Sequence, residues 1–247
     1  MRIDKESCIG CQACQPYCPM GCIIYDDREG ICKIDFDECV ECGICMRPAI
    51  CPTDALYQQE LDEKRLLRQA FSNPLIPHKT TSVPGRGTEE MKTNEVTARF
   101  KHGRAGVAAE LGRPGTGTRF KDVEKVAMAV AKVGVNFEPH NPVTHLMLDK
   151  ATGQMRPDIL DEKVLSAIVE FELGLDQLEA ALTAIKDVAP TLDTVFSLDL
   201  ACRMDPDNTV PTEAIARKVG FAPAINGKTN VGLGRPLARE DYRQCKI

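Results

Sequence analysis

The chain contains no apolar run that approaches the roughly 20 residues of a membrane-spanning helix, so we expect no membrane span. The first residues, Met1-Arg2-Ile3-Asp4, are charged and lack the apolar core of a secretion signal, which favours a cytoplasmic location. The formal net charge is −5, and nothing in the charge pattern suggests binding to nucleic acid. The sequence is therefore not typical of a membrane, secreted or nucleic-acid-binding protein.

Motifs of catalysis and of nucleotide binding are also missing. The sequence has neither the Gly-Lys-Ser/Thr loop that binds nucleoside triphosphates nor the glycine pattern that binds dinucleotides. Two isolated cysteines, Cys202 and Cys245, are interpreted as structural. The histidines have no paired nucleophile and are expected in loops or at strand starts: His78, His102, His140 and His145. We therefore predict no catalytic site within this chain.

What the chain has in abundance is cysteine near its N-terminus. Ten of the 12 cysteines lie between Cys8 and Cys51, and eight of these form two similar runs. The first run is Cys8-x-x-Cys11-x-x-Cys14-x-x-x-Cys18-Pro19. The second is Cys39-x-x-Cys42-x-x-Cys45, followed after five residues by Cys51-Pro52. Three thiolates at this spacing can bind three iron atoms of one cubane, and a remote Cys-Pro can supply the fourth ligand.

On these two runs, residues 1–58 resemble a bacterial-type ferredoxin with two [4Fe–4S] clusters. In that family each remote cysteine crosses over to the other cluster. The resemblance implies that cluster 1 is held by Cys8, Cys11, Cys14 and Cys51, and cluster 2 by Cys39, Cys42, Cys45 and Cys18. A structural zinc needs only four ligands, and a disulfide framework is typical of short secreted chains, so zinc and disulfides fit the pattern less well.

Two features depart from the family pattern. The second run has five residues, Met46-Arg47-Pro48-Ala49-Ile50, where the simple motif has three. Arg47 in this loop could raise the potential of a nearby cluster, or it could simply be solvated. Cys22 and Cys32 fit no ligand position, and we interpret both as small buried hydrophobic side chains.

An internal repeat supports the same architecture. Ile3-Asp4-x-x-x-Cys8 recurs 31 residues later as Ile34-Asp35-x-x-x-Cys39. Each half is expected to contain a short strand, a ligand loop, a helical turn after Cys-Pro and a returning strand. The returning strands are predicted at residues 22–25 and 55–57.

Acidic charge is concentrated in the first 58 residues, which hold ten acidic and five basic side chains, whereas the rest of the chain is balanced. We expect such an acidic electron carrier to meet a basic docking patch, because complementary fields speed encounter. Eight cysteines committed to iron indicate a reducing compartment, and we expect an anaerobic source.

The length of 247 residues suits two domains of α+β class. We predict a dicluster ferredoxin domain at 1–58, a helix and extended linker at 59–95, a βαββαβ ferredoxin-like sandwich at 96–205 and an extended tail at 206–247. The sandwich should have strands at 105–111, 144–149, 164–173 and 194–201 and helices at 121–133 and 175–188. Its role would be to bind a partner or to dimerise, since this order alone indicates no activity.

Three Gly-Arg segments, at 84–87, 111–117 and 232–236, could bring backbone N–H groups to a phosphate or could be simple turns. The basic residues around the second segment could form an anion site or a docking strip beside Glu110: Arg99, Lys101, Arg104, Arg113 and Arg119.

These patterns predict an iron–sulfur electron-transfer subunit of a multi-subunit oxidoreductase. Its partner would be a larger catalytic subunit that carries a flavin or a pterin-bound metal, and a soluble electron carrier could be a second partner. The alternative is a regulatory protein, in which the clusters sense redox state and the C-terminal domain binds a small effector.

Overall fold

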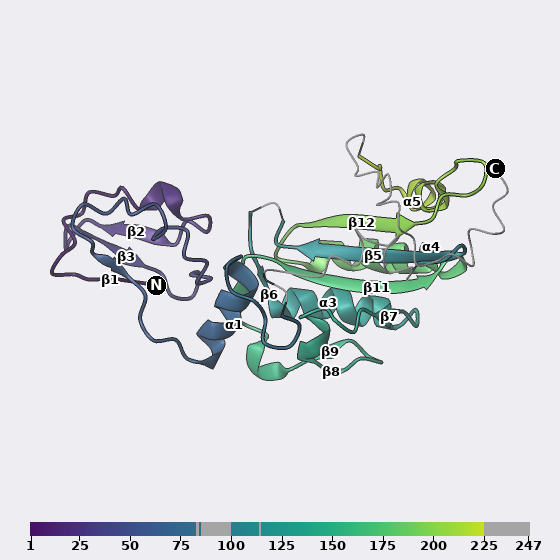
Figure 1. Ribbon diagram of the computed structural model, residues 1–247, viewed down its shortest axis with the longest axis horizontal. Coiled ribbons are helices and arrows are strands. Elements are labelled where there is room, and N and C mark those ends of the chain that lie inside the picture. The colour runs from purple at the N-terminus through teal and green to yellow at the C-terminus, as the bar shows by residue number, and fades with distance from the viewer. Residues whose placement is uncertain (83, 85–99, 114, 225–247) are drawn as a thin grey trace.

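The computed structural model describes residues 1–82, 84, 100–113 and 115–224. They form two lobes, with helix α1 (Glu63–Ser72) at the junction (Figure 1). The helix begins after Asp62, whose carboxylate accepts a hydrogen bond from the N–H of Arg65 at 2.8 Å, as an N-cap residue should. None of the described helices is both long and apolar enough to span a membrane.

The N-terminal lobe contains two antiparallel strand pairs. Strand β1 (Arg2–Ile3) pairs with β4 (Leu56–Tyr57), and β2 (Ile23–Asp26) pairs with β3 (Ile31–Ile34). These are the strands that the repeat predicted. The helical turn was predicted on the wrong side of Cys-Pro: a 3₁₀ turn at Gln15–Tyr17 precedes Cys18. Because Cys18 comes before Pro19, it adopts an extended conformation and the turn has to end there.

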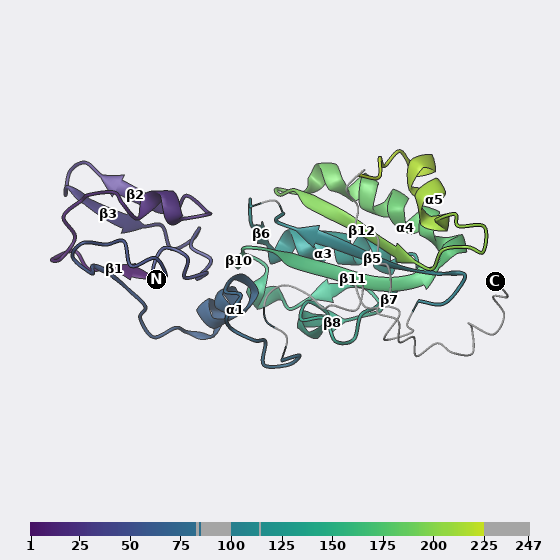
Figure 2. The ribbon, with the colours of Figure 1, turned by 45° about the horizontal axis from the view of Figure 1, so that its top comes forward.

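The C-terminal lobe is built on a four-stranded antiparallel sheet with the order β12-β5-β11-β7. Its strands are β5 (Arg104–Leu111), β7 (Asn136–Phe137), β11 (Ala167–Gly174) and β12 (Phe196–Cys202). Helices α3 (Phe120–Ala131) and α4 (Leu175–Val188) contact each other and the sheet (Figure 2). Alternate strand residues such as Val107, Val169 and Leu198 join the hydrophobic core beneath these helices.

The helices and three of the four sheet strands lie close to their predicted positions. The strand predicted at 144–149 is wrong, because the second strand of the sheet is the two-residue β7. Residues Thr144–Leu146 form a 3₁₀ turn, and β8 (Met147–Asp149) pairs with β9 (Gln154–Met155) in a hairpin outside the sheet. β7 is selected by packing, since Phe137 lies opposite Phe171 with its ring edge-on at 6.4 Å.

Smaller elements complete the C-terminal lobe. Strand β6 (Thr118–Arg119) pairs with β10 (Lys163–Val164), and further 3₁₀ turns lie at Pro157–Ile159 and Ala189–Thr191. Helix α5 (Pro211–Val219) lies in the region predicted as an extended tail, so that prediction is wrong for these residues. Ala216 of α5 is buried, α5 contacts α4, and Gly220 ends the helix at φ 92°. Residues 225–247 of the predicted tail, with Cys245, lie outside the described residues.

Helix α1 belongs to the C-terminal lobe, although it was predicted as part of a linker. Phe71 is buried in the same core as Phe120, and the two rings meet edge-on at 5.2 Å. Ser72 Oγ accepts a hydrogen bond from the N–H of Leu165 at 2.9 Å. His78 is also buried and packs on Phe71 at 4.4 Å. Residues 83 and 85–99 of the predicted linker lie outside the described residues.

The Gly-Arg segment at 111–117 contacts the N-terminal lobe. The N–H of Gly117 donates to the carbonyl of Gly112 at 3.2 Å, and both glycines have positive φ, at 72° and 83°. A Cβ added to Gly117 would lie 2.6 Å from Cε of Met20 in the N-terminal lobe. The described part of this segment is therefore a tight turn between the lobes. The segment at 232–236, and all but Pro84 of the segment at 84–87, lie outside the described residues.

We expect Gly117→Ala to destabilise the protein more than Gly115→Ala does. Both glycines have positive φ, so both variants carry similar backbone strain. Only at position 117 would the new Cβ meet neighbours, whereas nothing lies within 4 Å at position 115. Overpacking of this kind costs about 1–3 kcal/mol. Urea unfolding of the two variants measures the difference, and equal losses would show that Met20 yields without cost.

Candidate metal centres

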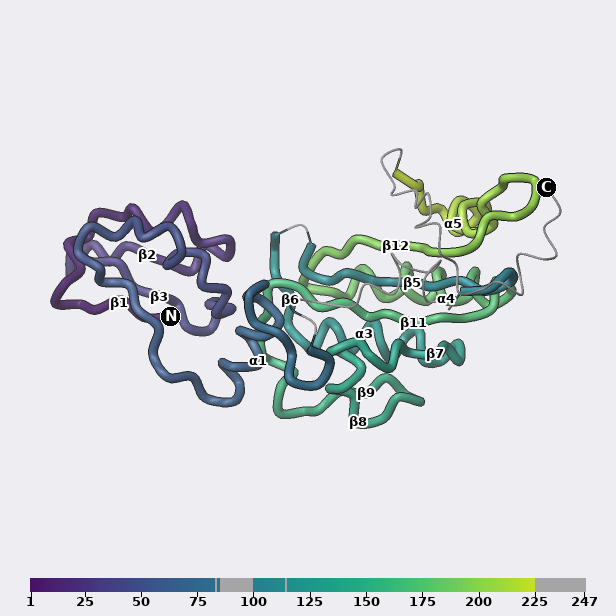
Figure 3. The backbone as a smooth tube through the Cα atoms, viewed as in Figure 1, coloured from purple at the N-terminus to yellow at the C-terminus, as the bar shows by residue number. Residues whose placement is uncertain are grey.

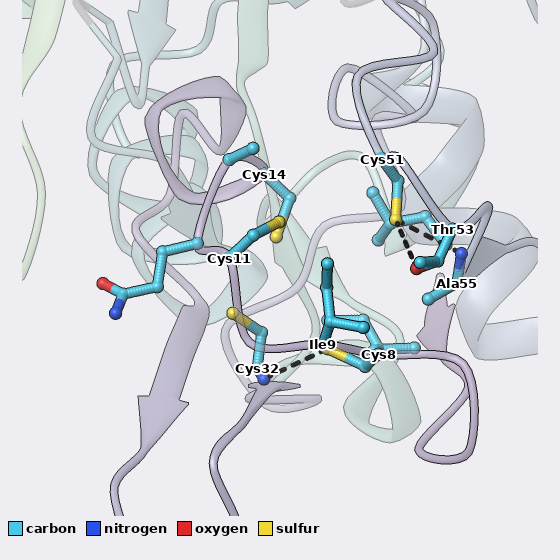
Figure 4. Close-up of a pocket in the computed structure, with 12 residues that line it drawn as sticks. Cys8, Ile9, Cys11, Cys14, Cys32, Cys51, Thr53 and Ala55 are labelled. Carbon is cyan, nitrogen blue, oxygen red and sulfur yellow. Dashed lines mark hydrogen bonds between the residues drawn. The ribbon is translucent and has the colours of Figure 1, made fainter.

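The N-terminal lobe contains two pockets, each lined by four cysteines of the two runs. Site 1 is the pocket lined by Cys8, Cys11, Cys14 and Cys51 (Figure 4). Site 2 is the pocket lined by Cys18, Cys39, Cys42 and Cys45. The chain thus brings together the two sets of four in which Cys18 and Cys51 have crossed over to the other run. The tube in Figure 3 shows the path of the backbone through this lobe, where long loops surround the short strands β1, β2 and β3.

The two sites are built from equivalent residues of the repeat. Ile3 and Ile9 line site 1, and their counterparts 31 residues later, Ile34 and Val40, line site 2. Leu56 lines site 1 from β4, as Ile23 lines site 2 from β2. Short strands with one apolar face therefore hold each ligand loop against an apolar wall.

Backbone N–H groups point at three of the sulfurs. The N–H of Cys22 donates to Cys18 Sγ at 3.3 Å, and the N–H of Ala55 donates to Cys51 Sγ at 3.3 Å. These two donors are equivalent, since each follows its Cys-Pro cysteine by four residues. The N–H of Cys32 donates to Cys8 Sγ at 3.4 Å. Such donors stabilise a thiolate and tune a bound cluster.

Cys22 and Cys32 are buried, as predicted, but they also line the sites, a placement that the spacing of the two cysteine runs does not predict. Cys22 lines site 2, with its Sγ 3.4 Å from Cys18 Sγ, and Cys32 lines site 1. The repeat contained the signal for this placement. Cys22 is the counterpart of Ala55 and Cys32 the counterpart of Met1, and both counterparts line a site.

The thiols differ in acidity because their surroundings differ. Burial raises the pKa of Cys14 to about 12 and that of Cys45 to about 11. A hydrogen bond from Cys22 lowers the pKa of Cys18 to about 5. A metal ligand has to be the thiolate, so uptake of metal at Cys14 and Cys45 releases protons and is favoured by higher pH.

The donor set fits iron–sulfur clusters better than zinc or disulfides. All cysteines of the described ranges are free thiols, so no disulfide framework is present there. Across residues 1–82, 84, 100–113 and 115–224, no three His, Cys, Asp or Glu side chains are grouped to hold a single metal ion. The four thiols instead lie around a pocket and do not converge on one point. Such an arrangement suits a cubane, in which each thiolate binds a different iron atom.

Arginine side chains contact the backbone of site 2. Arg65 Nη1 donates to the carbonyl of Cys39 at 2.8 Å, and Arg68 Nη1 donates to the same oxygen at 3.1 Å. Arg47 Nη1 donates to the carbonyl of Cys42 at 3.1 Å. The guanidinium of Arg47, from the five-residue loop that precedes Cys51, therefore lies beside site 2. The side chain of Arg47 is exposed to solvent, as one of the two alternatives held, and it is also hydrogen-bonded to the ligand loop of site 2.

Ion pairs connect the ligand loop of site 2 to the C-terminal lobe. Arg119 Nη2 lies 2.6 Å from Asp37 Oδ2 and 2.9 Å from Glu38 Oε1, and Lys163 contacts Glu38. The hydrogen bond from Arg119 lowers the pKa of Asp37. Arg68, which reaches the same loop, lies with Nε 2.6 Å from Glu162 Oε2. The N-terminal lobe is therefore fixed to its neighbour at site 2.

The basic cluster considered as an anion site does not converge on one. Arg104 pairs with Glu172 at 2.9 Å, Arg113 pairs with Glu110, and Arg119 turns to the N-terminal lobe. Arg99 lies outside the described residues. His102, His140 and His145 are exposed, and Cys202 Sγ contacts Thr212 Oγ1 at 3.3 Å. Lys101 is exposed, and among the described members of the cluster Arg119 is the one that contacts the chain's own N-terminal lobe.

We expect single replacements of Cys22 and Cys32 by Ser to leave iron content unchanged, because neither residue belongs to the two runs. Burial of a hydroxyl in place of a thiol should cost about 1–3 kcal/mol of stability. Iron analysis of the anaerobically purified variants provides the measurement, and Cys202→Ser is the matched control outside the sites. Loss of about four iron atoms from either variant would make that thiol a ligand.

Comparison with known proteins supports [4Fe–4S] clusters in the N-terminal lobe. The family model of a 4Fe-4S binding domain matches residues 1–24. Subunit PorD of pyruvate synthase from Methanocaldococcus jannaschii is 43% identical over 54 residues, which are 22% of this chain and 59% of the relative. The ferredoxin-like protein in the vnf region of Azotobacter vinelandii is 38% identical over 66 residues, 26% of this chain and 97% of the relative. No solved structure matched.

A further relative is one of the subunits of an ion-translocating oxidoreductase complex from Methanosarcina acetivorans, 43% identical over 54 residues, 22% of this chain and 19% of the relative. The chain spans about three fifths of the pyruvate synthase subunits that it matches. These matches cover only about a quarter of the chain, and the remainder matches no family. Through its N-terminal lobe, which binds [4Fe–4S] clusters and has cysteines enough for two, the chain belongs to the ferredoxin family of electron-transfer proteins.

Proposed function

We propose that this chain is the electron-transfer subunit of a multi-subunit oxidoreductase and exchanges single electrons with a larger catalytic subunit. The observation that carries the proposal is the pair of four-cysteine pockets in one small lobe. We assign Cys8, Cys11, Cys14 and Cys51 as the ligands of cluster 1, and Cys39, Cys42, Cys45 and Cys18 as the ligands of cluster 2. A [4Fe–4S] group supplies one-electron chemistry, while the chain's own residues bind it and tune its potential.

Two relatives are named as subunits of larger enzymes, which supports a subunit role here. The catalytic subunit that we propose carries a flavin or a pterin-bound metal, and a soluble electron carrier is the second partner. The C-terminal lobe is then the part that attaches the chain to the complex. We assign it as a βαββαβ ferredoxin-like sandwich, on the strength of the order β5-α3-β7-β11-α4-β12 and the sheet order β12-β5-β11-β7.

Native purification without oxygen, followed by mass spectrometry of the copurifying proteins, tests this function. A stoichiometric larger subunit with a flavin or a metal cofactor is the expected result. A free homo-oligomer with about eight iron atoms per chain, whose state changes with a small effector, would instead support the regulatory alternative.

A further inference from the structure

The two sites differ in exposure although they are built from equivalent residues. The side chain at the second position of each ligand loop is 63% exposed at Ile9 in site 1 but 1% exposed at Val40 in site 2. The next cysteine of each loop follows the same rule, since Cys11 is exposed whereas its counterpart Cys42 is buried. The repeat alone would make these pairs alike, so their surroundings cause the difference.

Residues of α1 and of the rest of the C-terminal lobe contact the loops that form site 2. Arg65 and Arg68 of α1 lie on the carbonyl of Cys39, and Gly117 lies against Met20, which lines site 2. Asn73, just after α1, has its amide nitrogen 3.6 Å from the position of a Cβ on Gly43. In the described part of the chain, no such contact from the C-terminal lobe reaches Ile9, Cys11 or the rest of site 1.

Charge separates the two ends of the N-terminal lobe in the same way. Beside site 2, Asp37 pairs with Arg119 and Glu38 pairs with Lys163, and both cations belong to the neighbouring lobe. The segments beside site 1 hold more acidic than basic side chains: Asp4, Glu6, Asp26, Asp27, Glu29 and Asp54 against Lys5, Arg28 and Lys33.

Two of these three basic side chains are already paired. Lys5 lies 3.6 Å from Glu29, and Lys33 lies 2.6 Å from Asp26. The hairpin that carries these carboxylates is next to the loop of site 1, because Gly10 packs directly on Gly30. Site 1 therefore has an apolar centre at Ile9 and an acidic rim.

We propose that the surface around Ile9 and Cys11 is the docking site for the redox partner that binds and leaves during turnover, a protein with basic side chains around an apolar contact. One electron passes between that partner and the N-terminal lobe, with no atom transferred. The inference rests on the proposed function. It adds that cluster 1 exchanges electrons with the transient partner, whereas cluster 2 faces the subunits to which the chain is permanently bound.

Electron transfer from the dithionite-reduced, full-length holoprotein to ferricytochrome c, a basic haem protein, tests the surface in a stopped-flow experiment. Each turnover oxidises the protein by one electron and reduces one haem. We expect Ile9→Lys to lower the second-order rate constant at least tenfold at low ionic strength. The control Leu148→Lys changes a leucine that is 62% exposed on β8 in the C-terminal lobe and lines neither site, and should change the rate less than twofold.

A second pair of variants separates local from net charge. Glu6→Lys/Asp27→Lys alters two exposed acids beside site 1, and Asp187→Lys/Glu213→Lys makes the same change of charge on α4 and α5. Only the first pair should slow the reaction at least tenfold, and the effect should shrink as salt screens it. Equal slowing by both pairs, or none by either site 1 variant, would overturn the proposal.

Iron content and the electron paramagnetic resonance signal of the reduced protein are measured first in every variant. Fewer than two clusters in the unaltered chain would refute the proposed function itself. If both clusters are intact and the variants at Ile9, Glu6 and Asp27 react with ferricytochrome c at the rate of the unaltered protein, only the docking surface is refuted.

Discussion

Replacement of Cys14 by Ala is expected to remove one cluster and leave the other, so that iron falls from about eight to about four atoms per chain. Cys14 lines site 1 and is not among the residues that line site 2. The counterpart variant Cys45→Ala should remove the other cluster. Iron analysis and the electron paramagnetic resonance spectra of the two reduced variants, which report different remaining clusters, measure the outcome.

The two variants should differ in their effect on the joined lobes. Site 1 has no described contact with the C-terminal lobe, so Cys14→Ala should leave the ion pairs of Asp37 and Glu38 intact. Cys45→Ala removes the metal behind the loop to which Arg65 and Arg68 donate, and should loosen it. Cys202→Ala serves as control. Loss of all iron from Cys14→Ala would argue that the two sites do not assemble independently.

Replacement of Arg68 by Met is expected to lower the free energy of unfolding by about 3–5 kcal/mol, because it removes one partner of a buried ion pair. The side chains of Arg68 and Glu162 are only 7% and 11% exposed. Arg68 also donates to the carbonyls of Asp37, at 2.7 Å, and Cys39, so the variant removes the donor to Asp37 and leaves Cys39 with Arg65 alone. Urea unfolding followed by far-ultraviolet circular dichroism and by cluster absorbance measures the loss.

The second half of this experiment asks whether the buried charge of Glu162 causes the loss. Arg68→Met/Glu162→Met should recover part of the stability, since a buried pair replaced by apolar side chains is often nearly neutral. Arg217→Met is the matched control, because Arg217 pairs with Glu213 on an exposed face of α5. If Arg68→Met cost no more than Arg217→Met, the two lobes would not depend on this contact.

The N-terminal lobe could be predicted from the sequence because the spacing of its cysteines is itself characteristic of iron–sulfur sites. Three cysteines at intervals of three residues, repeated, leave few chemical alternatives, and the 31-residue repeat also places the strands. Helix α4 was predicted at its observed bounds because Leu178, Leu182 and Ile185 recur on one face and Pro190 follows.

Contacts between residues far apart in the sequence could not be predicted from cysteine spacing or from the periodicity of apolar residues. The two residues of β7 form a strand because they pair with β11, where Phe137 packs against Phe171. Residues 147–149 are not part of the sheet, because they pair with residues 154–155 in a local hairpin. Arg68 looks like an ordinary helix residue in the sequence, and only the fold brings Glu162, 94 positions later, to its guanidinium. The exposure difference between Ile9 and Val40 likewise does not follow from the repeat, which makes the two positions equivalent.

Met20 makes the N-terminal lobe a poor candidate for transplantation into another protein. Met20 lines site 2 at the position that Thr53 occupies in site 1. The methyl group of Met20 lies against Gly117. A fragment cut after residue 58 would expose this thioether to water and strip the carbonyls of Phe36, Asp37 and Cys39 of their arginine donors. Such a fragment would retain every cysteine of both runs and yet carry a surface suited to permanent attachment. We therefore expect this ferredoxin domain to depend on the C-terminal lobe and not to be exchangeable between proteins.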